Sequence, residues 1–216
     1  MENTNLKKPE MKIKIHKIYL LASAALVLSG IITGMNMYGF TTLLYLTFLS
    51  NIFLAAYFFL SFFLYGKKEV LKSYLLMSVI IAISITALVY NFVIVPFADV
   101  APVFSMNMSF AWNFQNSMTH LFSMLLILAN YFIFEKKGLF KIKHVLVSTI
   151  FPLLYWLVFI TIGSIINFYP YFFMDVPAIG WGMTILWLII FISVFSFLGF
   201  LLFIIDRAMG KKQSTS

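Results

Sequence analysis

The sequence predicts an all-α protein, a polytopic membrane bundle of six transmembrane helices with both termini cytoplasmic. Of its 216 residues 62% are apolar and 26 are Phe, whereas soluble domains contain about 45–50% apolar residues. The mean hydropathy is +1.00. A water-soluble globule of this composition could not cover its own apolar surface, so that class is excluded. The chain has no Cys, which excludes disulfides, Cys-ligated zinc and thiol nucleophiles.

Six apolar runs predict the six spans. They contain 18 to 24 residues each, at about 18–35, 42–65, 73–95, 112–134, 145–166 and 182–205. Such lengths fit helices that cross a hydrocarbon core of about 30 Å, and lipid forces a helix because it cannot bond free backbone groups. None of the 15 basic and 7 acidic residues falls within a run. We therefore expect a basic arm (1–17), a six-helix domain (18–205) and a cytoplasmic tail (206–216).

The basic residues predict the orientation. All 15 of them lie in four stretches, at residues 7–17, 67–72, 136–143 and 207–212. The intervening breaks at residues 36–41, 96–111 and 167–181 contain only Asp99 and Asp175 as charged residues. By the positive-inside rule, both termini are cytoplasmic and these three breaks face outward across the cell membrane. The first run is too long for a signal-peptide core and no small-residue cleavage site follows it, so we expect a retained first span.

The distribution of charge also bears on partners. Because the basic residues are split among four short stretches, we expect no nucleic-acid partner, and we expect the basic arm to contact anionic lipid headgroups. Within the runs, Pro152 predicts a kink in the fifth span. Gly30 and Gly34 form a GxxxG pattern that permits close helix contact but is frequent by chance.

Among the histidines, His120 is the candidate for chemistry. We expect His16 and His144 to be solvated, because they lie in lysine-rich segments. His120 lies eight residues into the fourth run, about 12 Å below its outer end, and is the one residue inside a run that titrates near neutral pH. Ionisable groups inside spans are usually functional. The alternative is a neutral histidine that holds two helices together by a hydrogen bond.

Thr47 lies at a similar depth on the second run, about 8 Å below the outer end. Each of these two residues has a polar neighbour four positions away on its own helix face: Asn51 beside Thr47, and Asn116 beside His120. Lipid offers polar faces no partner, so we expect them to turn toward each other. A hydroxyl beside an imidazole is the minimum for nucleophilic catalysis, with Asn51 or Asn116 as oxyanion donors. Equally, Thr and Asn often hold membrane helices together.

A resemblance favours the catalytic interpretation. The stretch YLTFLSN (45–51), the element NSMTH (116–120), and the stretches FPLLYWLVF (151–159) and NFYPYFFMDVPAIGWG (167–182) resemble the androgen-induced gene family of six-span membrane threonine hydrolases, in its bacterial branch. The resemblance covers the second to sixth spans. It implies hydrolysis of lipid esters, in animal members fatty acid esters of hydroxy fatty acids, with Thr47 as nucleophile and His120 as its base.

The last outer break has two interpretations. Tyr169, Pro170, Tyr171 and Asp175 form either a lid, in which Asp175 orients a headgroup or His120, or an interfacial aromatic belt with a rigid proline turn. Established hydrolase, nucleotide and metal motifs are missing from the sequence, so we expect neither cofactor nor metal. The function hypotheses are an intramembrane lipid-ester hydrolase and a non-catalytic membrane scaffold. A small-solute transporter ranks third, because no paired helix interruption is visible.

Overall fold

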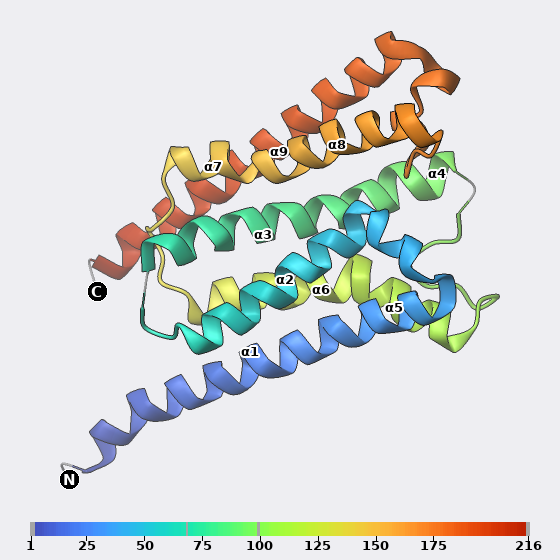
Figure 1. The fold of residues 1–216 in the computed structure, drawn as a ribbon. Coiled ribbons are helices and arrows are strands. Elements are labelled where there is room, and N and C mark those ends of the chain that lie inside the picture. Colours follow the sequence, from blue (N-terminus) through green and yellow to red (C-terminus); the bar gives the residue numbers. More distant parts are fainter. Residues whose placement is uncertain (1–2, 68, 99, 215–216) are drawn as a thin grey trace.

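The computed structural model describes residues 3–67, 69–98 and 100–214, and all regular structure among these residues is helical (Figure 1). Six helical segments are long and apolar enough to cross a membrane, which confirms the predicted all-α class and the number of spans. These spans are Glu10–Tyr38, Leu46–Phe63, Leu71–Phe97, Phe110–Phe134, Ile142–Ile166 and Val176–Lys211.

Successive spans run in opposite directions, so the chain ends lie at the same end of the bundle (Figure 1). The lysine-bearing loops after the second and fourth spans lie there too, and we call it the basic end. The elements are α1 (Asn3–Tyr38), η1 (Phe40–Leu44), α2 (Leu46–Phe63), α3 (Glu69–Val89), η2 (Tyr90–Ile94), α4 (Val95–Phe97), α5 (Phe110–Ser117), η3 (Met118–Phe122), α6 (Ser123–Ala129), η4 (Asn130–Phe134), α7 (Ile142–Ser148), α8 (Ile150–Ile166), η5 (Phe172–Met174) and α9 (Val176–Ser214).

The second span begins later than the apolar run predicts. After α1, Gly39 adopts a φ of 74°, which favours glycine, and a 3₁₀ turn, η1, follows. Tyr45 is then extended, and the α-helix starts at Leu46 rather than at residue 42. Thr47 is consequently the second residue of α2. Its backbone N–H belongs to the first turn, where helices have unbonded N–H groups.

The third and fourth spans each contain π-helical turns. These are η2 in the third span, and η3 and η4 in the fourth. A π turn inserts an extra residue into a helix and is frequent at functional sites. His120 lies in η3, and Tyr90 is the first residue of η2. The two rings stack with their centroids 3.8 Å apart, so the two irregular turns meet in the bundle.

The fifth and sixth spans are also interrupted. α7 ends at Ser148 and α8 resumes at Ile150. Pro152 lacks the N–H that would bond to the carbonyl of Ser148, so the kink predicted at this proline lies one turn before it. In the sixth span Gly180 has a φ of 77°, and it bends the start of α9. α8 and α9 lie together on one side of α3, opposite α1 (Figure 1).

Small residues bring α1 against its neighbours. A Cβ added to Gly30 would lie 2.6 Å from the Cβ of Met118, and one added to Gly34 would clash with the ring of Phe48. Both glycines of the GxxxG pattern therefore lie where helices approach closely. The packing of α1 on α2 and on the fourth span depends on these two positions, so here the pattern is more than a chance match.

Candidate functional site

A cavity of about 520 Å³ lies toward the end of the bundle opposite the basic end, within the range of small-molecule sites. Its walls come from the end of α1, η1, the start of α2, the ends of α3 and η2, the fourth span, α8, η5 and α9. Thr47, Asn116 and His120 are among its lining residues, whereas Asn51 and Asp175 are not. The cavity thus brings together residues of the second and fourth spans that the sequence places at similar depth.

Thr47 is buried, and it lines the cavity at the beginning of α2. The hydroxyl of Tyr171 lies beside the Thr47 side chain and the backbone of Thr47 and Leu46. Tyr155 donates to the carbonyl of Leu44 over 2.8 Å. Tyr155 of α8 and Tyr171 of the loop after α8 therefore contact the segment that carries Thr47.

Tyr171 remains protonated under ordinary conditions. Its burial raises the pKa of the phenol to about 12, although hydrogen bonds from Thr47 oppose the shift. The residue thus offers a neutral O–H next to Thr47 at any pH near neutrality. The sequence marked Tyr171 only as part of a lid or an aromatic belt. Its contact with Thr47 depends on how the loop folds back over α2, which no local motif encodes.

The imidazole of His120 is held by its surroundings rather than by a carboxylate. One face stacks on Tyr90, at an interplanar angle of 21°, and the backbone of Thr86 lies beside the ring. Among the described residues, Nδ1 is buried without a hydrogen-bond partner. A buried polar atom without a partner is uncommon in folded proteins. His120 therefore has hydrogen-bonding capacity that its protein neighbours do not use.

Asn116 fixes the ring on which His120 stacks. Its amide donates to the hydroxyl of Tyr90 over 2.8 Å, and Tyr90 donates to the carbonyl of Ala101 over 2.6 Å. This chain joins the fourth span, η2 and the loop after the third span. Asn116 reaches the cavity itself, with its amide nitrogen already bonded.

Asn51 lies behind the cavity wall, fully buried. Its amide donates to the carbonyls of Thr47 and Thr119, over 2.8 and 3.1 Å, and its oxygen accepts from Ser123. The residue joins α2 to the π turn that carries His120. Its hydrogen bonds therefore hold together the two helices that carry Thr47 and His120.

Residues of the loop between the last two spans have two different structural roles. The segment from Pro170 to Met174 lines the cavity, and Tyr169 packs its ring against Gly163. Asp175 instead accepts a hydrogen bond from the backbone N–H of Ala178 over 3.1 Å, at the start of α9. The carboxylate thus caps a helix, while the aromatic part of the loop covers the cavity.

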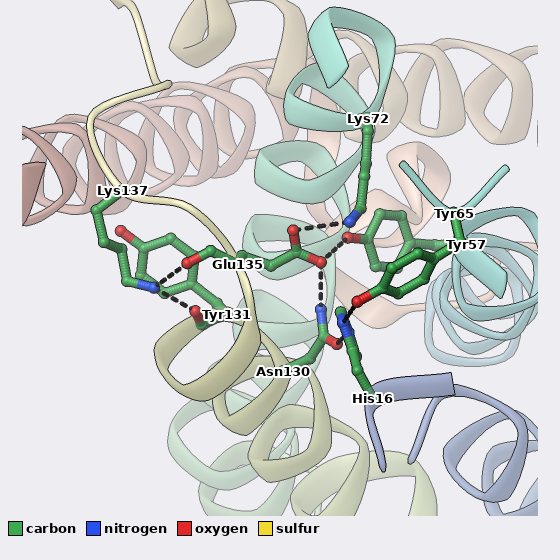
Figure 2. Close-up of polar contacts among 8 residues, drawn as sticks. All are labelled: His16, Tyr57, Tyr65, Lys72, Asn130, Tyr131, Glu135 and Lys137. Carbon is green, nitrogen blue, oxygen red and sulfur yellow. Dashed lines mark hydrogen bonds and ion pairs between the residues drawn. The ribbon is translucent and has the colours of Figure 1, made fainter. Parts of the chain in front are cut away.

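A second polar cluster lies at the basic end (Figure 2). His16 interacts through Nδ1 with the hydroxyl of Tyr65, at 3.1 Å, and through Nε2 with the side-chain oxygen of Asn130, at 2.9 Å. Asn130 and Tyr57 both donate to Glu135, over 3.1 and 3.2 Å. His16 is 3% exposed, so the expectation of a solvated residue is wrong, because Tyr65, Asn130 and Phe134 pack around its ring.

His144 is buried as well, which corrects the second expectation of a solvated histidine. Its Nδ1 accepts a hydrogen bond from the backbone N–H of Lys141 over 3.1 Å, and its ring meets that of Tyr74 with centroids 3.9 Å apart. A lysine-rich sequence context indicated exposure. In the fold Lys141 precedes α7 and Lys143 lies within it, while the side chain of His144 turns inward and caps the helix.

Comparisons with protein-family models, with curated proteins and with solved structures find no match for this chain. The chain is a six-helix protein of membrane-spanning character.

Proposed function

We propose that this protein is an integral membrane hydrolase that cleaves lipid esters in the outer half of the bilayer, with Thr47 as nucleophile and His120 as base. The observation that carries the proposal is that one cavity is lined by both residues. The resemblance of residues 45–51 and 116–120 to the androgen-induced gene family supports the same pair. A cavity within an apolar bundle also suits a substrate that is itself dissolved in lipid.

The reaction proceeds in two halves. His120 takes the proton of the Thr47 hydroxyl while Oγ1 attacks the ester carbonyl, whose electron pair moves onto its oxygen. The tetrahedral intermediate then collapses, the ester C–O bond breaks, and His120 returns the proton to the departing alcohol. In the second half, water gives a proton to His120 and attacks the acyl-threonine. Collapse releases the fatty acid, and the proton returns to Thr47.

The intermediate requires hydrogen-bond donors for its negatively charged oxygen. Asn51 and Asn116 are the donors expected from the sequence, and their amide nitrogens already bond to protein groups. We assign the role to the hydroxyl of Tyr171 and to the N–H groups of Leu46 and Thr47, which share a corner of the cavity. The positive end of the α2 dipole adds to this stabilisation.

Purified protein assayed on long-chain esters, compared with the variants Thr47→Ala and His120→Gln, tests the proposal. Each variant is expected to lose a factor of about 10² or more in kcat, the usual contribution of a nucleophile or base. Thr161→Ala is the matched control, because Thr161 is exposed on α8 and its hydroxyl donates to the carbonyl of Leu157 in its own helix. It is expected to retain full activity.

A covalent probe provides a second readout. A fluorophosphonate lipid should label Thr47, as located by peptide mass spectrometry, and labelling should disappear in His120→Gln. Equal turnover by the parent protein and Thr47→Ala would overturn the catalytic assignment. Lipid binding without turnover in both would instead identify a non-catalytic lipid-binding protein.

A further inference from the structure

Among the residues that the structure describes, none that lines the cavity is Asp, Glu, Lys or Arg. The sequence extends this observation, because no basic residue occurs between Lys17 and Lys67, between Lys72 and Lys136, or between Lys143 and Arg207. The three loops at the end opposite the basic end contain two charged residues in the sequence, Asp99 and Asp175. Asp99 lies outside the described residues. A bound anion would therefore find no countercharge there.

Part of the cavity wall is apolar, and we call the space beside it the apolar arm. Thr149 with one face of α8 up to Trp156, and one face of α9 from Leu188 to Phe195, border it. Seven residues of rise make each of these faces about 10 Å long. The side chains on both faces are mainly hydrocarbon, aromatic or proline, and their polar atoms are the hydroxyls of Thr149 and Tyr155 and the indole nitrogen of Trp156. This arm suits an acyl chain.

Another part of the cavity is lined by hydroxyl, imidazole and amide side chains. Thr47, His120 and Tyr171 line it, together with Tyr38 at the end of α1, Thr41 in η1 and Gln115 in α5. These groups can hydrogen-bond an ester or an alcohol, yet none of them carries a fixed positive charge. Removing a carboxylate from water without a partner costs several kcal/mol.

We propose that the cavity selects uncharged esters, an inference that rests on the proposed function. The acyl chain lies in the arm between α8 and α9, and the ester carbonyl lies beside Thr47. Substrates with a carboxylate or phosphate close to the ester are excluded. The fatty acid product ionises in water, so the same lack of countercharge favours its release. Hydroxy fatty acid esters, which carry a free carboxylate, are then poor substrates until that carboxylate is masked.

A matched pair of substrates tests the selection. A fatty acid ester of a hydroxy fatty acid is compared with its methyl ester at pH 9, where the free carboxylate is ionised. Both are measured at equal surface concentration in the same detergent micelles. The methyl ester is expected to have a kcat/KM about tenfold higher or more, which corresponds to about 1.4 kcal/mol. Equal values, or faster cleavage of the carboxylate form, would overturn the proposal.

Two variants locate the discrimination in the cavity. Thr41 is exposed, lines the cavity, and bonds only to the carbonyl of Tyr38. Thr41→Arg supplies the missing cation and is expected to reduce the preference for the methyl ester by at least about threefold. Thr41→Gln, the uncharged control, is expected to preserve it. A preference unchanged by the arginine would place the discrimination outside the cavity, against the proposal.

A binding assay separates this inference from the hydrolase itself. Competition against a fluorescent monoacylglycerol on Thr47→Ala reports charge preference without turnover. If no ester is cleaved but the methyl ester competes about tenfold better than the carboxylate form, the hydrolase fails and the charge selection holds. If neither competes, or both compete equally, the charge selection fails whatever the outcome for catalysis.

Discussion

Asn51 shows what a single polar residue does in an apolar helix. Each polar group of its side chain is bonded, to the carbonyls of Thr47 and Thr119 and to the hydroxyl of Ser123. Thr47 is itself a candidate catalytic residue, Thr119 lies next to His120 in η3, and Ser123 begins α6. Since lipid offers no alternative partner, the side chain fixes the distance between α2 and η3.

Replacing Asn51 by Ala is expected to lower the free energy of unfolding by about 1–3 kcal/mol, because buried hydrogen-bonding groups lose their partner. Thermal denaturation in detergent measures the change. Asn91→Ala is the control, since its amide bonds only within its own helix, to the carbonyl of Ala87. The interpretation is contradicted if the two variants are equally stable.

Tyr171 is a second single residue with a proposed role, as the oxyanion donor beside Thr47. Tyr171→Phe removes a hydroxyl that contacts Thr47 and is expected to reduce kcat by about 10- to 1000-fold, as for the loss of one oxyanion donor. The pKa of Tyr171 is raised to about 12, so its proton is present throughout pH 6 to 10. The ratio of parent to variant activity should therefore be constant over this range. A ratio that changes with the deprotonation of a group near pH 8 would argue against this assignment.

The helices depend on where they can approach each other. Gly30 and Gly34 lie on α1 against Met118 and the ring of Phe48. Phe48 follows Thr47 directly and also lines the cavity. Close packing at Gly34 therefore supports the start of α2 as well as the bundle. The GxxxG spacing alone could not show which helix faces these glycines.

Gly34→Ala is expected to destabilise the protein by about 1–3 kcal/mol, the usual cost of overpacking, and to lower hydrolysis through displacement of Phe48. Gly182→Ala serves as the matched control, because a Cβ there has no neighbour within 4 Å. Melting temperature and initial rate report both effects. Equal behaviour of the two variants would show that the contact at Gly34 is unimportant.

Across the whole molecule, polar groups are concentrated toward the two ends. Glu135 gathers one cluster, with an ion pair to Lys72 at 2.8 Å and hydrogen bonds from Tyr57 and Asn130 (Figure 2). It connects α2, α3 and the end of the fourth span. The cavity with Thr47 and His120 lies toward the other end. The basic-end cluster therefore serves as a junction for the bundle, remote from the proposed chemistry.

Glu135→Ala is expected to reduce the free energy of unfolding by about 2–4 kcal/mol, because it removes one partner of a largely buried ion pair. Activity per folded molecule should be unchanged. The control is Glu10→Ala, which removes an exposed carboxylate at the same end. Equal melting temperatures for the two variants would show that the cluster is dispensable, and a selective loss of kcat would show that it is coupled to the cavity.

Six apolar helices follow from the sequence alone, because the backbone N–H and C=O groups of a long uncharged run in lipid must bond to each other. The sequence also singled out Thr47, Asn116 and His120, because polar residues in such runs are few. The fold is needed to show that Tyr171 contacts Thr47, that Asn51 is buried outside the cavity lining, and that His16 and His144 are buried. These facts depend on contacts between residues distant along the chain, such as His16 with Asn130. Hydropathy and local spacing record how each segment meets its solvent, whereas the packing of helices decides which side chains meet each other.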